Sequence, residues 1–112
     1  MEIKDARIKD VIENSDSKNG LTVDFSVRIN GGECHLGFNT KNAVDAQRLE
    51  RIMEYTGSHE YSDLNGKEVR VANKNRQLQG IGHPYLDRFI PMFTEDFQQV
   101  TESKIEEMIK DL

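Results

Sequence analysis

The chain has 112 residues and one cysteine, and its 20 acidic residues against 15 lysines and arginines give a net charge of −5. This length indicates one domain, and a single cysteine excludes an internal disulfide framework. The acidic balance disfavours nucleic-acid binding as the main activity, because that activity rests on positive charge. No apolar run approaches the ~20 residues that span a bilayer, and the first residues lack the apolar stretch of a signal peptide. We therefore expect a cytoplasmic protein without membrane contact.

The negative charge is concentrated at the C-terminal end of the sequence. Residues 94–112, TEDFQQVTESKIEEMIKDL, contain six acidic and two basic residues, so they carry −4 of the total −5. Their apolar residues fall on one helical face, opposite the charged ones. We predict an acidic amphipathic helix over 94–112 and an almost neutral remainder of the protein.

The first 40 residues show the alternation of antiparallel strands. From Gly20 to Ile29 every second residue is apolar, and Cys34, Leu36 and Phe38 continue the alternation after Asn30-Gly31-Gly32. A turn at Asn30-Gly31 or one at Gly31-Gly32 would both match apolar with apolar residues, so the register stays open. Residues 2–12 alternate imperfectly, which predicts a strand with an irregularity, and 14–20 form a polar connection. The segment should be a three-stranded meander.

The rest of the chain predicts two helices and two or three more strands. Asn42 can cap a helix over 43–56, and Gly57 can end it in a left-handed conformation. Strands are expected over 68–72 and 77–82, joined by a turn at 73–76, with a last short strand over 85–90. Gly80 and Gly82 suggest a bulge or a close backbone approach. The predicted fold is therefore a single α+β domain over 1–112, with an antiparallel sheet of five to six strands in the order β-β-β-α-β-β-(β)-α.

Four aromatic residues recur every four positions, from the first residue of the last predicted strand onward. They are Tyr85, Phe89, Phe93 and Phe97, and Pro91 in their midst argues against one continuous helix. We expect all four to close the core where the last strand gives way to the terminal helix.

No motif in the sequence points to catalysis, a metal or a cofactor. Cys34 and His35 are strand neighbours, so they point to opposite faces and Cys34 should lie in the core. The histidines at 35, 59 and 83 lack the spacing of metal ligands, and the glycines form no nucleotide-binding fingerprint. We therefore predict a protein that is not an enzyme.

Two sets of surface residues are candidates for binding. Arginines and a histidine suited to a small anion or an acidic partner are Arg28, His35, Arg70, Arg76 and Arg88, although Arg28 can instead pair with Glu33 across the hairpin. In the terminal helix, the candidates for partner contact are Glu102, Glu106, Glu107 and Met108. That helix has three open roles: packing on its own sheet, pairing with a second subunit in a homodimer, or presenting acidic residues to a basic surface.

The segments IKDARIK, GLTVDFSVRINGGECHLGF, RLERIMEYTG, DLNGKEVRV and LQGIGH occur in this order over residues 1 to about 90. In order and spacing they resemble a family of small uncharacterised proteins encoded in the early regions of tailed phages and mobile elements. The resemblance implies an accessory protein that binds a host factor, a defence component or a defence signal. We expect a non-enzymatic protein that binds a protein partner and inhibits a host defence system. The alternatives are capture of a nucleotide signal at Arg28 and His35, and an accessory role in nucleic-acid binding.

Overall fold

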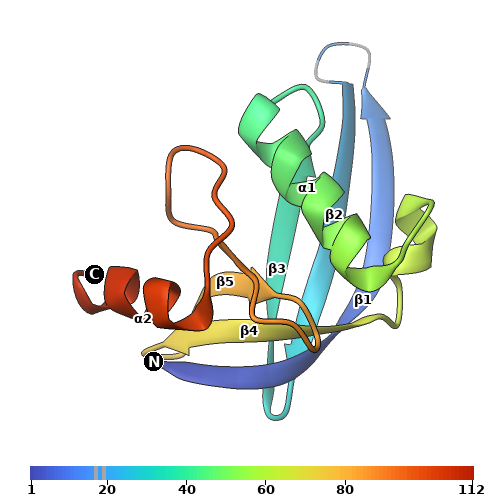
Figure 1. Ribbon diagram of the computed structural model, residues 1–112. Coiled ribbons are helices and arrows are strands. Elements are labelled where there is room, and N and C mark those ends of the chain that lie inside the picture. Colours follow the sequence, from blue (N-terminus) through green and yellow to red (C-terminus); the bar gives the residue numbers. More distant parts are fainter. Residues whose placement is uncertain (17, 19) are drawn as a thin grey trace.

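A computed structural model describes residues 1–16, 18 and 20–112 of the chain. It has the predicted α+β fold, with six antiparallel strands in one curled sheet (Figure 1). The elements are β1 (Glu2–Asp16), β2 (Gly20–Ile29), β3 (Gly32–Asn39), α1 (Ala43–Thr56), the 3-10 helix η1 (Tyr61–Leu64), β4 (Glu68–Lys74), β5 (Gln77–Gly82), β6 (Phe89–Pro91) and α2 (Glu102–Lys110). The strand order in the sheet is β3-β2-β1-β4-β5-β6, so β1 joins the two meanders. In the described part of the chain, no helix is both long and apolar enough to cross a membrane.

The β2–β3 hairpin adopts one of the two registers that the sequence left open. Its turn is Asn30-Gly31, and Val27, Phe25 and Val23 pair with Cys34, Leu36 and Phe38. Gly31 has a φ of +90°, a conformation that glycine adopts without the steric cost of a side chain. The register therefore places the apolar side chains of both strands on the same face of the sheet.

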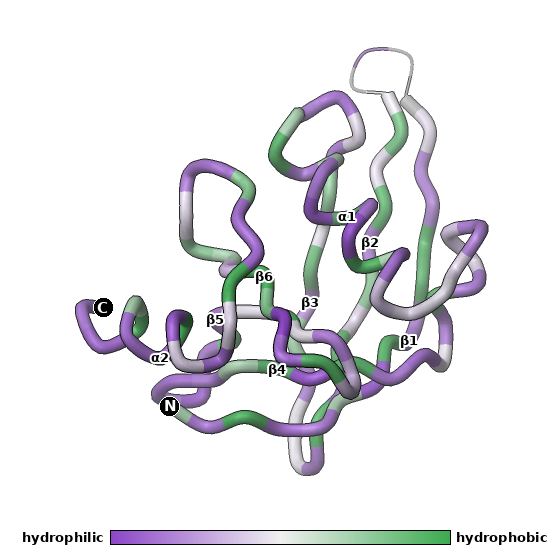
Figure 2. The backbone as a smooth tube through the Cα atoms, in the orientation of Figure 1, coloured by the Kyte–Doolittle hydropathy of each residue, from purple (hydrophilic) through white to green (hydrophobic). Residues whose placement is uncertain are grey.

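The predicted irregularity of β1 is a bulge between Lys9 and Ile12, where Asp10 has a φ of +57°. Hydrophobic and hydrophilic stretches alternate along this strand (Figure 2). The strand continues to Asp16, so the expected polar connection was wrong for residues 14–16, which pair with β2. Ser17 and Asn19, in the remainder of that expected connection, lie outside the described residues.

The sheet has an inner face, which packs against α1, and an outer face on the opposite side. The main core joins the inner face to Leu49, Ile52 and Tyr55 of α1 and to Leu64 of η1. As predicted, Asn42 caps α1, accepting a hydrogen bond from the Asp45 backbone N–H at 3.0 Å, and Gly57 ends the helix in the left-handed conformation.

A second, smaller core lies on the outer face, where α2 covers β4 and β5. It contains Ala72, Phe89, Ile105 and Ile109, all of them buried. The close approach expected at the two glycines of β5 is confirmed: a Cβ on Gly80 would meet the Ile105 side chain, and one on Gly82 would meet the Phe89 ring. A bulge in the same strand, opposite Ala72 and Asn73, is confirmed as well. The helix thus packs on its own sheet, the first of its three open roles.

Three predicted boundaries in the second half of the chain were wrong. The turn between β4 and β5 is only Asn75-Arg76, both with positive φ, because Asn73 and Lys74 still pair with β5. The last strand begins at Phe89 rather than Tyr85 and includes Pro91.

The third error concerns the terminal helix, which begins at Glu102 rather than Thr94, with Thr101 as its N-cap. Val100 instead forms an isolated β-bridge with Phe89, and residues 92–96 form bends rather than helix. The helix α2 itself contains three acidic and two basic residues, a net −1, so most of the negative charge lies beside it rather than in it.

Candidate partner-binding site

α2 leaves the outer face of β1, β2 and β3 uncovered. A row of charged side chains crosses this face and continues onto β4. Glu33, Arg28, Arg7 and Glu68 lie side by side, because each is the cross-strand partner of the next. Arg28 donates hydrogen bonds to Glu33 at 3.0 Å, as the sequence suggested, and to Asp10 at 2.8 Å, while Arg7 pairs with Glu68 at 2.8 Å. The hydrogen bond to Glu33 and the charge of Asp10 raise the pKa of Arg28. The charge of Arg28 is therefore balanced by two carboxylates of its own chain.

His35 lies beside this row, next to Ser26 and Glu33. Its Nδ1 lies 2.9 Å from the Ser26 hydroxyl, and its Nε2 lies 3.9 Å from a Glu33 carboxylate oxygen, beyond hydrogen-bonding distance. A serine, a histidine and a glutamate are the components of a nucleophilic triad, but Ser26 is 0% exposed and cannot meet a substrate. Cys34 lies on the inner face as expected, although it is half-buried rather than fully in the core.

Arg70, the third predicted ligand residue, holds the loop that connects β5 to β6. This Tyr85 loop comprises residues His83–Arg88. The guanidinium of Arg70 lies 5.0 Å from the centroid of the Phe89 ring, and it donates to the carbonyls of His83 at 2.8 Å and Leu86 at 2.6 Å. The N–H donors of Arg70 thus hold the backbone of the Tyr85 loop. Arg88, another predicted ligand residue, is the last residue of the same loop.

The side chain of His83 fixes the Tyr85 loop from within. Its Nδ1 accepts hydrogen bonds from the backbone N–H groups of Tyr85 at 3.0 Å and Leu86 at 2.9 Å. The backbone adds two more bonds, from His83 N–H to the Arg88 carbonyl and from Arg88 N–H to the Leu86 carbonyl. Asp87 then accepts a hydrogen bond from the Glu102 N–H at the start of α2. Side-chain and backbone hydrogen bonds thus hold the loop at both ends and in its middle, and Asp87 links it to α2.

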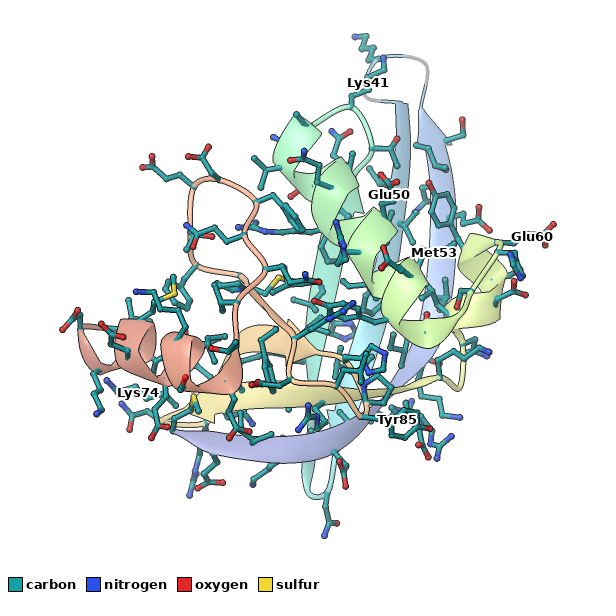
Figure 3. All side chains as sticks on the ribbon, viewed as in Figure 1. Lys41, Glu50, Met53, Glu60, Lys74 and Tyr85 are labelled. Atoms are coloured by element: carbon teal, nitrogen blue, oxygen red, sulfur yellow. The ribbon has the colours of Figure 1, made fainter. Side chains whose placement is uncertain are left out.

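This rigid loop presents two apolar side chains to solvent. Tyr85 is 79% exposed and Leu86 is 47% exposed, so the prediction that Tyr85 closes the core was wrong, whereas Phe89 is fully buried as expected. Figure 3 shows Tyr85 below the C-terminal end of α1. Scattered exposed apolar residues are common, but here two adjacent ones project from backbone that six hydrogen bonds and a cation–π contact hold in place.

A hollow of about 460 Å³ on the outer face connects the Tyr85 loop to the charged row. Tyr85 and Pro84 line one side of this hollow, and Arg7, Arg28 and Glu68 line the other. The structure therefore brings Arg28 and the loop held by Arg70 to one surface, although the two arginines make no common contact. We call this surface, with Tyr85, Leu86 and the hollow, the Tyr85 surface.

His83 remains a neutral acceptor because of its surroundings. Burial, followed by the positive charges of Arg88 and Arg70, lowers the pKa of His83 from its ordinary 6.5, and Glu54 opposes the shift. The rings of Tyr55 and Tyr85 lie against it at 5.4 and 5.9 Å between centroids. Burial raises the pKa of Tyr55 to about 12, and its hydroxyl donates to Gln99 at 2.6 Å.

We predict that acidification opens the Tyr85 loop. Protonation at Nδ1 removes the acceptor of two hydrogen bonds, and the lowered pKa means that folding favours neutral His83. This stabilisation is fully present above pH 6.5 and is lost as the pH falls through the folded-state pKa. Amide hydrogen exchange at Tyr85 and Leu86 should accelerate in that range, after correction for the intrinsic rate, while the amide of Ile81 keeps its protection. Unchanged protection of the loop amides down to about pH 4 would contradict this role of His83.

The partner residues predicted in the terminal helix lie along α2. Glu102, Glu106 and Glu107 are exposed and Met108 is half-buried, whereas Ile105 and Ile109 face the sheet. Because Glu102 follows directly from the contact with Asp87, the acidic residues begin beside the Tyr85 loop.

Among the described residues, no three His, Cys, Asp or Glu side chains lie close enough together to hold a metal ion. The chain matches no protein-family model, and neither the curated proteins nor the solved structures contain a match. The geometry of the Tyr85 surface is therefore the basis for assigning a function. The sequence did not reveal this surface, because the exposure of Tyr85 depends on how His83 and Arg70 hold the loop.

Proposed function

We propose that this chain is a non-enzymatic binding protein that acts by stoichiometric contact with a protein partner through the Tyr85 surface. The observation that carries the proposal is the rigid presentation of Tyr85 and Leu86 to solvent. Tyrosine and arginine are the residues enriched at the energetic centres of protein interfaces. Holding Tyr85 and Leu86 in the bound conformation beforehand lowers the entropic cost of association.

The surroundings of the two side chains fit an interface of this kind. The hollow beside Tyr85 can receive a side chain of the partner, and its lining includes Arg7 and Arg28 as well as Asp5 and Glu68. Both arginines are already paired with carboxylates, so a partner need not neutralise them. The exposed acidic residue Glu102, whose backbone N–H donates to Asp87 of the loop, borders the surface and favours a partner with a basic margin.

The biological setting of the proposal comes from the resemblance to phage and mobile-element proteins. We propose that the partner is a component of a host defence system and that binding inhibits it in the cytoplasm. Inhibition by occupation of a surface requires no catalytic group in the inhibitor. It requires only a complex that stays bound for the length of the infection.

Native mass spectrometry after incubation with host lysate tests the class of function. We expect the wild-type chain to carry one protein partner at fixed stoichiometry, and the same partner to be recovered by Ile12→Ala. Ile12 is a matched control because it is 54% exposed on the outer face and lies outside the Tyr85 surface. The double variant Tyr85→Ala/Leu86→Ala should lose that partner. Recovery of nucleic acid without any protein, or equal capture by all three chains, would overturn the proposal.

A further inference from the structure

A second cavity lies on the inner face, at the open end of the curled sheet. It has a volume of about 760 Å³ and lies between the turn of the β2–β3 hairpin and that of the β4–β5 hairpin, next to the start of β1. Sites for small molecules commonly have volumes of about 300 to 1,000 Å³, apolar walls and a few placed polar groups. The Tyr85 surface lies on the other face of the sheet, so the cavity is a separate feature.

The wall of the cavity is mixed, with four aliphatic and eight polar or charged residues, and one of the polar side chains is a nearly buried amide. Val27, Ile29, Val71 and Leu78 line it, and Asn73 follows Val71 on the same face of β4. Asn73 is only 8% exposed, and its side-chain amide has no hydrogen-bond partner within the described residues. Among the described residues Arg48 Nε is the one fully buried side-chain polar atom without a partner, so the Asn73 amide reaches the solvent of the cavity, where it is placed to pair with a ligand.

The charges around the cavity leave one cation available. Lys4 pairs with Glu2 at 3.1 Å, and Glu33 is bound by Arg28 on the outer face. Lys74 donates to the carbonyls of Ile109 and Leu112 at the end of α2, which Figure 3 shows beside it. Arg76, in the turn after β4, forms no ion pair or hydrogen bond with any residue that the structure describes.

We infer that this cavity binds a purine nucleotide. The carboxamide of Asn73 offers one donor and one acceptor side by side, the pattern that pairs with the N6 and N7 edge of adenine. The partly exposed side chains of Ile29 and Leu78 cover the faces of the ring, and Arg76 binds the phosphate. The site differs from the one expected at Arg28 and His35, whose charges are occupied on the opposite face.

Calorimetric titration of the full chain with AMP, adenosine and inorganic phosphate tests the assignment. AMP should bind with a dissociation constant below about 1 mM, adenosine about threefold more weakly, and phosphate alone without detectable heat. No binding of AMP at that concentration would overturn the inference. Phosphate binding as tightly as AMP would overturn it as well, since it would reveal an anion site without base recognition.

Two variants test which residue contacts the base and which contacts the phosphate. Asn73→Leu, which keeps the volume and removes the amide, should weaken AMP about tenfold, while Arg76→Gln should weaken AMP about threefold and leave adenosine unchanged. Equal AMP affinity in Asn73→Leu would refute the site. If that variant fails to fold, amide shift mapping of the wild-type chain gives the answer. AMP should shift the resonances of both hairpin turns, and shifts confined to other residues would contradict the inference.

Discussion

Replacing Phe89 with alanine should reduce the free energy of unfolding by about 3–5 kcal/mol, among the largest losses expected from one substitution in this chain. The ring is fully buried, it packs directly on the backbone of Gly82, and it contacts α2 and the Arg70 guanidinium. An alanine leaves a cavity that the sheet backbone cannot fill. Urea denaturation followed by circular dichroism measures the effect.

Phe93→Ala is the matched control for this prediction. Phe93 packs against the same small core but is only partly buried, so its truncation should cost less than about 2 kcal/mol. Equal losses in the two variants would show that the contact of Phe89 with Gly82 is not the centre of this core. Because Phe89 also supports Arg70, the loop amides of Tyr85 and Leu86 should lose exchange protection in Phe89→Ala.

The double variant Tyr85→Ala/Leu86→Ala should weaken binding of the purified partner by about 100-fold, at the level of an interface hot spot. Both side chains project from a loop whose hydrogen bonds come from His83, Arg70 and backbone, so these bonds remain when the side chains are removed and only the ring contact of Tyr85 with His83 is lost. Their exposure also means that the free energy of unfolding should change by no more than about 0.5 kcal/mol. Surface plasmon resonance gives the affinity, and denaturation gives the stability.

Ile12→Ala again provides the comparison, since it removes a similar exposed apolar group from another part of the outer face. Its affinity should equal that of the wild type within about twofold. Equal weakening in Ile12→Ala and the double variant would indicate a diffuse surface rather than the Tyr85 surface. A double variant that loses stability together with affinity would mean that the two side chains support the loop.

The first meander and α1 could be predicted from the sequence because their signals are local. Five alternating residues before Asn30-Gly31 specify a hairpin whose faces cannot be exchanged. Asn42 and Gly57 mark the ends of α1 through the backbone groups that they satisfy or the φ that they permit. In each case the residues that determine the structure are neighbours in the chain.

The start of α2 could not be predicted because a distant contact decides it. Phe97 and Val100 fit the helical stripe of Ile105 and Ile109, yet Val100 exchanges backbone hydrogen bonds with Phe89 at 2.8 Å. Tertiary pairing overrides helix propensity at such positions. This pairing of Val100 with Phe89 becomes apparent only once β6 is known, and β6 has only three residues.

The candidate site was predictable in part. The pairing of Arg28 with Glu33 follows from the hairpin register, and the sequence indicated it. The exposure of Tyr85 did not follow from the sequence, because its spacing from Phe89 and Phe93 is what a buried stripe would show. It arises from His83 and Arg70, which bind the backbone of a loop whose conformation no local motif encodes.

Photo-cross-linking from position 85 tests the proposed function most directly. A benzoylphenylalanine side chain would replace Tyr85 in one variant, Ile12 in a second and Glu106 in a third, each mixed with host lysate and irradiated. Binding through the Tyr85 surface predicts one strong covalent adduct with a host protein from position 85, a weak one from position 106 in α2 and none from position 12. Adducts from position 106 or 12 with none from position 85 would contradict it.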